Sequence, residues 1–356
     1  MNILLLTKNF DLGGAEVHVR ELANELVGEG NKVHLASRSG RQTQQLDTRI
    51  RHHSLNFSEL QFPANFLKLS RLIKEQDIDL VHGHQRMAIT LAAILGKRHR
   101  IPSIATVHGK IRLDIRSTLV RKLLSHVIVV SPLQLSFLDP DSSLRGKSSI
   151  IYNSTPPTSL NREIKRDQAI TYVSRIDRKH YRVLKDLVEN IYPEIRNQYP
   201  SVKLNIIGDG PCAHDLEELI DTTTNDHIRN GIILHGYQED PKSILSKSML
   251  TLGVGRCAIE SLSVNTPVIS ANSLWCGGLI SKSNYQQLKG MNFIARSSHP
   301  YSWKILTEQI LDFLARKDSY LNANEGIHQQ VLKDFSSRKM TKEIIELYES
   351  GLDGAP

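Results

Sequence analysis

One stretch decides the fold of this chain: Leu252-Gly253-Val254-Gly255-Arg256-Cys257-Ala258-Ile259-Glu260-Ser261-Leu262, which continues into Asn265-Thr266-Pro267-Val268-Ile269-Ser270. An apolar run reaches a Gly-x-Gly turn, a short helical segment follows, and a second apolar strand comes after Pro267. A strand, a glycine turn, a helix and a strand in this order place the N–H groups of a helix N-terminus against phosphate oxygens. The stretch therefore predicts an α/β fold in which Gly255, Arg256 and Cys257 meet a phosphorylated ligand.

Glu260 lies about one turn inside that helical segment, and its position has two interpretations. A carboxylate there can accept hydrogen bonds from two neighbouring hydroxyls, as a ribose offers. The helix macrodipole also favours an acid near any helix start, without a ligand. The stretch alone leaves both interpretations open.

Length and composition limit the class of protein. At 356 residues the chain is long for a single core, which predicts two domains of ordinary size. No apolar run approaches the roughly 20 residues of a membrane span, and the N-terminus reads as a strand rather than a signal peptide. Cys212, Cys257 and Cys276 are too few and too scattered for a disulfide framework or a metal site. We therefore expect a cytoplasmic protein without a bound metal.

The net charge of +8 is unevenly placed along the chain. Residues 1–160 hold 21 Lys and Arg against 13 Asp and Glu, whereas the remainder is balanced. Such asymmetry indicates a surface that meets an anionic partner. Nucleic acid is not expected, because the basic residues show no aromatic interleaving and no recognised motif. The remaining candidate partners are an anionic membrane and a phosphorylated acceptor. Any membrane contact is expected to be peripheral.

Basic residues of the first half collect after strands and in helices, and each cluster alone is typical of a solvated helix face. Because the whole excess charge lies here, we favour a real positive face. Its candidate residues are Arg38, Arg41, Arg49, Arg51, Lys97, Arg98, Arg100, Lys110, Arg112, Arg116, Arg121 and Lys122.

The first half alternates strands with helices. Apolar strands are expected at residues 3–7, 33–36, 78–84, 103–107 and 126–130. Gly13 and Gly14 lie in the turn after the first strand, which favours a role on the phosphate side. His108 follows a strand directly and precedes a glycine, so we place it at the site. His34 and His126 lie inside apolar strands and are interpreted as packed core histidines.

A second α/β run follows a segment at residues 156–162 that reads as an interdomain linker. Its first strand, at residues 170–173, ends in a positive cluster that includes Arg175 and Lys179. The strand at residues 204–207 runs into the tight turn Gly208-Asp209-Gly210. Two consecutive Rossmann-like halves with glycine turns predict a ligand cleft between two domains.

The predicted organisation has three parts. The first Rossmann-like domain spans residues 1–157 and the second spans residues 158–335. A last helix within residues 336–356 is expected to cross back to the first domain.

In order and spacing these motifs resemble the retaining glycosyltransferases of the GT-B fold, specifically the large family 4. The resemblance covers nearly the whole chain through Gly13-Gly14-Ala15-Glu16, Thr106-Val107-His108-Gly109, Tyr152-Asn153, Ser174-Arg175-Ile176-Asp177, Gly208-Asp209-Gly210-Pro211, and Glu260 with Thr266-Pro267-Val268-Ile269. It implies two Rossmann-like domains that face a central cleft, with the acceptor on the first and the nucleotide-sugar donor on the second.

The resemblance also implies the roles of single residues. In the family, a glycine loop and an Arg/Lys pair contact the donor diphosphate, the second Glu of a Glu-x7-Glu motif holds the ribose, and a histidine lies near the transferred sugar. The catalytic candidates are accordingly His108, Arg175 and Lys179. The donor-binding candidates are Gly13, Gly14, Gly208, Gly210, Gly255, Arg256, Cys257 and Glu260.

Two positions depart from the family pattern. The first Glu of Glu-x7-Glu would stand at position 252, which is Leu252, so the usual contact to the sugar hydroxyls is missing. The family's lysine lies five residues after the arginine, where this chain has His180, and Lys179 stands one place earlier. These departures predict altered donor choice or lost activity.

The function that the resemblance implies is transfer of a hexosyl or N-acetylhexosaminyl group from a nucleotide sugar, with retention, to a lipid-linked or cell-surface polysaccharide acceptor such as a lipopolysaccharide. It implies no cofactor beyond the nucleotide-sugar co-substrate, and the basic cluster can replace a metal cation. A non-catalytic nucleotide-sugar-binding partner of an active transferase is the alternative. A sugar-nucleotide epimerase of the same fold would need acid and base residues in the cleft, to which no residue is assigned.

Overall fold

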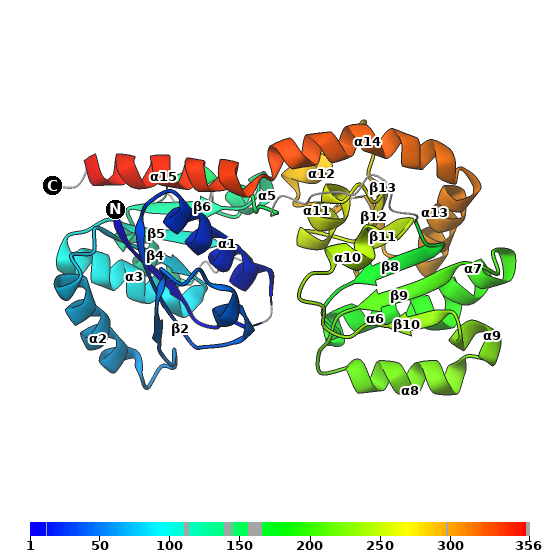
Figure 1. Cartoon of the computed structure of the whole chain (residues 1–356), viewed down its shortest axis with the longest axis horizontal. Coiled ribbons are helices and arrows are strands. Elements are labelled where there is room, and N and C mark those ends of the chain that lie inside the picture. Colours follow the sequence, from blue (N-terminus) through cyan, green and yellow to red (C-terminus); the bar gives the residue numbers. More distant parts are fainter. Residues whose placement is uncertain are drawn as a thin grey trace. The chain divides into compact units, whose positions relative to one another are not determined.

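The computed structural model describes residues 1–11, 13–109, 114–138, 144, 146–155, 166–296 and 298–353. The chain divides into two compact units, which we call unit 1 (Met1–Pro156 with Phe335–Pro356) and unit 2 (Pro157–Asp334). Each unit contains one seven-stranded sheet with helices (Figure 1). The segment at residues 156–162 lies outside the described residues, as do Lys110, Arg112 and the side chain of Arg116.

Unit 1 is built on a sheet of order β3-β2-β1-β4-β5-β6-β7 in which every neighbouring pair is parallel. Its strands are β1 (Asn2–Thr7), β2 (Lys32–Ser37), β3 (Arg51–Ser54), β4 (Leu80–His84), β5 (Ser103–Val107), β6 (His126–Val129) and β7 (Ser148–Ile150). Its helices are α1 (Gly14–Gly28), the 3-10 turn η1 (Arg41–Gln45), α2 (Phe62–Glu75), α3 (Arg86–His99), α4 (Ile115–Leu123), α5 (Pro132–Ser136) and α15 (Ser337–Asp353). The strand order reverses between β1 and β4, so the switch point at which such sheets bind ligands lies there.

Strand β1 is apolar on both sides because helices cover both faces of the sheet. Ile3 and Leu5 point into a core shared with α1 and α15. Leu4 and Leu6 point into the opposite core, shared with α2 and α3. All four side chains are fully buried, which explains why the sequence of this strand shows no alternation of polar and apolar residues.

Helix α15 completes unit 1 from the far end of the chain and packs beside α1 (Figure 1). Met340, Ile344 and Tyr348 enter the same core as Ile3 and Leu5. Their spacing of four residues puts them on one helix face, as an amphipathic helix requires. Without this helix, one face of the sheet of unit 1 would lose part of its cover.

Unit 2 repeats the plan with a sheet of order β10-β9-β8-β11-β12-β13-β14, in which the last two pairings, β12 with β13 and β13 with β14, are antiparallel. Its strands are β8 (Ala169–Val173), β9 (Lys203–Ile207), β10 (Ile232–Leu234), β11 (Leu250–Gly253), β12 (Val268–Ala271), β13 (Trp275–Leu279) and β14 (His299–Pro300). Its helices are α6 (Arg178–Asp186), the π-helical turn η3 (Leu187–Ile191), α7 (Tyr192–Gln198), α8 (Ala213–Thr223), α9 (Asp226–Arg229), α10 (Lys242–Leu245), α11 (Arg256–Ser263), α12 (Tyr285–Gly290), α13 (Trp303–Ala315) and α14 (Lys317–Asp334). The switch point of this sheet lies between β8 and β11.

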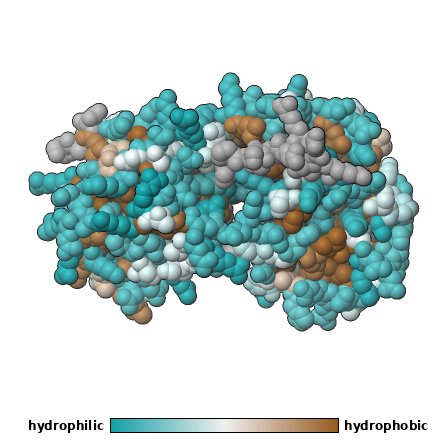
Figure 2. Space-filling view, viewed as in Figure 1, coloured by the Kyte–Doolittle hydropathy of each residue, from teal (hydrophilic) through white to brown (hydrophobic). Residues whose placement is uncertain are grey.

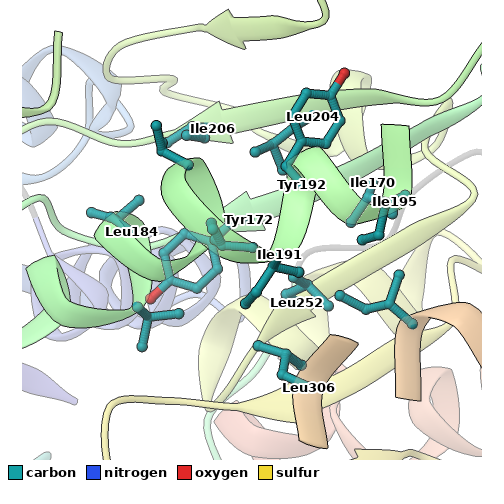
Figure 3. Close-up of a cluster of buried hydrophobic side chains, with 14 of the residues drawn as sticks. Ile170, Tyr172, Leu184, Ile191, Tyr192, Ile195, Leu204, Ile206, Leu252 and Leu306 are labelled. Carbon is teal, nitrogen blue, oxygen red and sulfur yellow. The ribbon is translucent and has the colours of Figure 1, made fainter. Parts of the chain in front are cut away.

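The core of unit 2 gathers side chains from one face of β8 and β11 and from the helices that cover it (Figure 3). Tyr172, Leu252 and Leu306 belong to one buried cluster there. On the surface, hydrophilic residues dominate the face seen in Figure 2, and hydrophobic side chains appear there in separate patches. The predicted fold, two Rossmann-like α/β domains, is confirmed.

The two histidines expected in the core differ in burial. His34 is 4% exposed, and burial lowers its pKa to about 4, assisted by His53 and Arg51. His126 is half-buried, and its Nε2 pairs with the Ser149 hydroxyl at 2.9 Å. Only the first is a fully packed core histidine, because His126 begins its strand.

Candidate active site

Three loops meet at the carboxyl edge of the sheet of unit 2, after β8, β9 and β11. Backbone hydrogen bonds join the first two: the N–H of Ser174 donates to the Ile207 carbonyl at 3.1 Å, and the N–H of Ile176 donates to the Asp209 carbonyl at 3.0 Å. The N–H of Cys212 returns a bond to the Ile176 carbonyl at 3.0 Å. The loop that carries Arg175 is therefore held by backbone bonds to its neighbour, in addition to the bond from the Ser174 hydroxyl to the Arg175 carbonyl at 3.1 Å.

Gly208 and Gly210 make that contact between loops possible. Both have positive φ, +148° and +157°, which side chains rarely adopt. A Cβ on Gly208 would lie 1.9 Å from the Ser174 carbonyl oxygen, and one on Gly210 would lie 2.4 Å from that of Ile176. The role that the structure shows for both glycines is close packing of backbone beneath Arg175.

The two basic residues that the sequence predicted at this site are both exposed. Arg175 lies on the loop after β8, and Lys179 lies at the start of α6. Asp177 caps α6, because its carboxylate accepts from the N–H groups of Lys179 and His180. The His180 ring also pairs with Asp177, with 2.8 Å between Nδ1 and Oδ1. His180 is thus occupied by the helix cap, whereas Lys179 stands at the rim of a pocket of about 460 Å³ with Asp177 and Cys212.

The loop after β11 leads into α11 through Gly255, whose φ is +59° and whose N–H donates to the Asn292 carbonyl at 3.0 Å. The first N–H groups of a helix have no acceptor within the helix, and those of Arg256 and Cys257 lie at this edge. Burial raises the pKa of the Cys257 thiol to about 12, so this residue is a neutral thiol rather than a nucleophile.

Glu260 is 9% exposed and pairs with Arg256 on the same helix. The Arg256 Nε donates to the Glu260 Oε1 at 2.7 Å. The pair is spaced i,i+4, the separation at which side chains meet on a helix, so the sequence could have indicated it. Of the two carboxylate oxygens of Glu260, only Oε1 is used in this bond.

Leu252, which replaces the family's first glutamate, lies on β11 and is fully buried in the core of unit 2 (Figure 3). Its register neighbours are Tyr172 on β8 and Ile269 on β12. The side chain at this position therefore packs into the core on one face of the sheet.

In unit 1, Gly13 and Gly14 join β1 to α1 at the switch point. Gly13 precedes the helix with φ +146°, and a Cβ there would lie 2.4 Å from the Glu16 Oε2. Gly14 is the first residue of α1 and is exposed. The positive φ explains why a glycine stands at position 13, because side chains rarely adopt this backbone conformation.

Gln85, which the sequence reasoning missed, connects the loop after β1 to helix α1 at this switch point. Its Oε1 accepts from the N–H groups of Lys8 and Asn9, both at 3.1 Å, and its Nε2 donates to the Glu16 Oε1 at 2.8 Å. Its backbone has a φ of +65°, a costly conformation for a residue with a side chain. The sequence signal that could have identified Gln85 is its place as a polar residue directly after a strand.

His108 belongs to a group of histidines at the carboxyl edge of unit 1. Its Nε2 lies 3.3 Å from the Nδ1 of His84, and its ring contacts that of His18 edge-on, with centroids 4.6 Å apart. His82 lies behind them, and burial together with His108 lowers its pKa to about 3. Burial, with the neighbouring histidines, also holds the pKa of His84 well below its usual value. At neutral pH, His82 and His84 are therefore uncharged.

Two family models match the chain: Glycosyltransferase Family 4 over residues 12–158 and Glycosyl transferases group 1 over residues 167–285. The first match falls in unit 1 and ends at the boundary between the units, and the second falls in unit 2. The chain belongs to the glycosyltransferases of the GT-B fold that carry a family 4 domain, as the resemblance predicted.

Curated relatives agree with this assignment. One subunit of the phosphatidylinositol N-acetylglucosaminyltransferase of Homo sapiens is 25% identical over 244 residues, which cover 61% of this chain and 50% of the human protein. The gpi3 subunit of the same transferase from Schizosaccharomyces pombe is 23% identical, covering 95% of this chain and 78% of the yeast protein. The chain thus spans only half the length of the human relative.

Solved structures share the fold over the whole chain. A glycosyltransferase from Rickettsia africae superposes with a TM-score of 0.76 at 17% identity, covering 99% of both chains. The Anabaena protein Alr3699/HepE, in complex with UDP, superposes with a TM-score of 0.74 at 15% identity, covering 98% of this chain and all of that one.

The glycine contact beneath Arg175 generates the first prediction. Gly208→Ala is expected to lower the free energy of unfolding by about 3 kcal/mol or more, because it adds a clash with backbone to a strained φ. Gly236→Ala is the matched control: its φ is +61° and a Cβ there meets nothing within 4 Å. The control is expected to lower the free energy of unfolding by about 1–2 kcal/mol, because only the backbone strain at a positive φ remains. Urea unfolding measures both, and equal losses would contradict the proposed backbone contact.

Proposed function

We propose that this protein is a retaining glycosyltransferase that moves a hexosyl or N-acetylhexosaminyl group from a nucleotide sugar to a lipid-linked or cell-surface polysaccharide acceptor. One observation carries the proposal: Arg175 and Glu260 follow neighbouring strands, β8 and β11, on either side of the switch point of unit 2. That position suits a nucleotide diphosphate, because it offers positive charge, helix N–H groups and a carboxylate together.

The relatives support both the donor and the acceptor class. The Anabaena protein has been crystallised with UDP and with UDP-glucose. The human and yeast relatives are, by their names, subunits of a phosphatidylinositol N-acetylglucosaminyltransferase. A relative at 22% identity is named as a glycosyltransferase of capsular polysaccharide biosynthesis in Staphylococcus aureus. UDP-glucose and UDP-N-acetylglucosamine are therefore the first donors to try.

In the proposed mechanism, unit 2 holds the donor and stabilises its leaving group. When the bond between the sugar and the diphosphate breaks, negative charge grows on the diphosphate. Arg175 and Lys179 neutralise that charge, and the N–H groups of Arg256 and Cys257 donate to the phosphate oxygens. Glu260 accepts from the ribose hydroxyls through the oxygen that Arg256 leaves unused. The protein's fixed cations take the part that a metal ion plays elsewhere, so we expect no cofactor beyond the nucleotide sugar.

Unit 1 is proposed to contribute His108 near the transferred sugar and to bind the acceptor. The transition state of glycosyl transfer has oxocarbenium character, which a neutral imidazole can stabilise by hydrogen bonding to a sugar hydroxyl. His108 is half-exposed at the carboxyl edge of its sheet and therefore accessible from solvent.

The charge of Arg175 provides the main test of the function. Arg175→Ala is expected to reduce the rate of donor turnover on the order of 10²–10³-fold, as loss of a group that stabilises transition-state charge does. The rate is measured as UDP release from each donor, with and without acceptor. Lys185→Ala removes another exposed cation, near the other end of α6, and should leave the rate unchanged. An equal drop in the rate of both variants would mean that the overall positive charge of the protein matters, and not stabilisation of the leaving diphosphate by Arg175.

The ribose contact is tested separately by binding. Glu260→Gln keeps an acceptor for the Arg256 guanidinium but loses the charge and one of two acceptor oxygens. We expect UDP to bind about ten- to a hundredfold more weakly, the loss of one charge-assisted hydrogen bond. Calorimetry measures the affinity, and Glu325→Gln, an exposed carboxylate bonded to Asn265, is the matched control. Unchanged affinity in a variant with a native melting profile would refute the ribose assignment.

A non-catalytic nucleotide-sugar-binding protein is the second candidate, and the buried Leu252 favours it. The family's glutamate at this position is absent, and a strand residue packed in the core cannot replace it. The two candidates differ in one result: a binding protein would take up UDP-sugars by calorimetry but release no UDP from any donor or acceptor. Release of UDP above the level of the Arg175→Ala variant excludes it.

A peripheral membrane contact is proposed for the amino edge of the sheet of unit 1. Lys97 and Arg98 end α3, Lys122 ends α4, and all three are exposed. Both helix ends lie beside the start of β5, where the Ser103 hydroxyl donates to the Leu123 carbonyl. Leu119 and Leu123 on α4 are 57% and 40% exposed, so apolar side chains accompany the charges. Arg121, expected among the exposed cations, is buried instead, and its guanidinium donates to Thr118.

We expect binding to anionic vesicles that fades with added salt, since no helix among the described residues is long and apolar enough to span a bilayer. Neutralising Lys97, Arg98 and Lys122 together should weaken binding about a hundredfold, at about 1 kcal/mol per cation. Neutralising three exposed lysines of unit 2, Lys185, Lys203 and Lys247, is the matched control. Equal sedimentation with neutral and anionic vesicles would refute this contact.

A further inference from the structure

Three histidines from three different elements of unit 1 converge at the carboxyl edge of its sheet. His18 lies on α1, His84 ends β4, and His108 follows β5. One ring nitrogen of each lies within 4.8 Å of the corresponding nitrogens of the other two. Because each ring is carried by a different packed element, the cluster is a product of the tertiary fold and not of one local turn.

The spacing of these nitrogens suits a divalent transition metal. Two nitrogens bound to one tetrahedral Zn²⁺ at about 2.0–2.1 Å lie about 3.3–3.4 Å apart. His84 Nδ1 and His108 Nε2 are already 3.3 Å apart. The third ring therefore needs an approach of at most about 1.5 Å to complete the set. His18, on a helix, can supply this through its side-chain torsions.

His84 has bonding capacity that the protein does not use. The ring is fully buried, and its Nε2 has no hydrogen-bond partner among the residues that the structure describes. Nδ1 is the nitrogen that faces His108, so a cation at that pair binds Nδ1, and Nε2 then carries the hydrogen of the neutral ring.

A second layer holds the ring of His84 in place. The ring of His82 lies against it, with centroids 4.2 Å apart. His82 is itself fixed by two buried contacts, from Nδ1 to the Tyr348 hydroxyl at 2.5 Å and from Nε2 to the Thr106 hydroxyl at 2.8 Å. Metal sites depend on such outer contacts to orient their ligands. Both nitrogens of His82 are occupied, so it supports the cluster without joining it.

We propose that His18, His84 and His108 form a binding site for a divalent transition metal of the Zn²⁺ class. Three imidazoles with a fourth position open to water form a known zinc ligand set, and the half-exposed His108 places that opening toward solvent. Imidazole donors without a carboxylate select Zn²⁺, Co²⁺ or Ni²⁺ over Mg²⁺ and Ca²⁺. On binding, the hydrogen shared between His84 and His108 moves to the other nitrogen of its own ring, so both facing atoms present lone pairs and no proton is lost.

Occupancy of this site would remove His108 from the sugar. If His108 acts in transfer, as proposed above, then Zn²⁺ is an inhibitor whose effect a chelator reverses. This consequence rests on the proposed function, whereas metal binding itself does not.

The test uses the full chain, freed of metal with a chelator and titrated with Co²⁺, whose visible absorption reports a tetrahedral site. We expect a saturable signal at one Co²⁺ per chain, displaced by Zn²⁺ and not by Mg²⁺. His84→Ala and His108→Ala should each abolish the saturable signal. His53→Ala is the matched control, because His34 and His53 also face each other at 3.1 Å, with no third histidine, cysteine or carboxylate grouped with them among the described residues.

Each outcome decides the proposal. Absence of a saturable signal overturns it, as does a signal that survives His108→Ala or that His53→Ala removes equally. If His84→Ala loses its native melting profile, the result for His108→Ala decides the proposal instead. The half-exposed ring of His108 is less important for packing, so this variant is expected to fold. Co²⁺ that binds as expected to a chain without transferase activity would refute the proposed function and leave the metal site standing.

Discussion

The candidate active edge of unit 2 depends on a contact between two backbones that leaves no room for a side chain. Gly208 lies so close to the Ser174 carbonyl that a Cβ would fall 1.9 Å from its oxygen. This approach lets the loops after β8 and β9 exchange hydrogen bonds, and those bonds set the position of Arg175. An exposed arginine on an otherwise unsupported loop would lose much of its electrostatic value to reorganisation. The glycines thus fix the backbone that carries Arg175, which its proposed role in charge stabilisation requires.

Much of the fold could be predicted because local pattern and global topology agree. The run at residues 3–6 is apolar on both faces, and its continuation into Gly13 and Gly14 indicates a buried parallel strand followed by a helix. The same reasoning located Arg175 directly after one strand and Glu260 in the helix that follows another. The sheet order makes those two strands, β8 and β11, neighbours at one switch point. Each of these inferences needs only the sequence around one turn.

What the sequence could not supply are contacts that join distant segments. Gln85 bonds to residues 76 and 77 positions earlier, and no periodicity indicates that link. Arg121 reads as one more cation of a basic helix, yet it is buried against Thr118. Leu252 shows the converse case. Its identity departs from the family pattern, and only the core around it explains that the position has become part of the packing.

Tyr348 extends the same argument to the whole of unit 1. It is separated by 266 residues from His82, with the whole of unit 2 between them in sequence, and its hydroxyl meets a buried imidazole at 2.5 Å. The ring beside that imidazole, His84, in turn faces His108. Unit 1 therefore acquires its complete carboxyl edge only when α15 has docked, after the rest of the chain has been made. Contacts of such high sequence separation are slow to form, because the chain loses conformational entropy on closing the loop before the contact contributes any favourable free energy. The histidine edge of unit 1 is consequently a property of the whole chain, although most of its residues belong to the first 110.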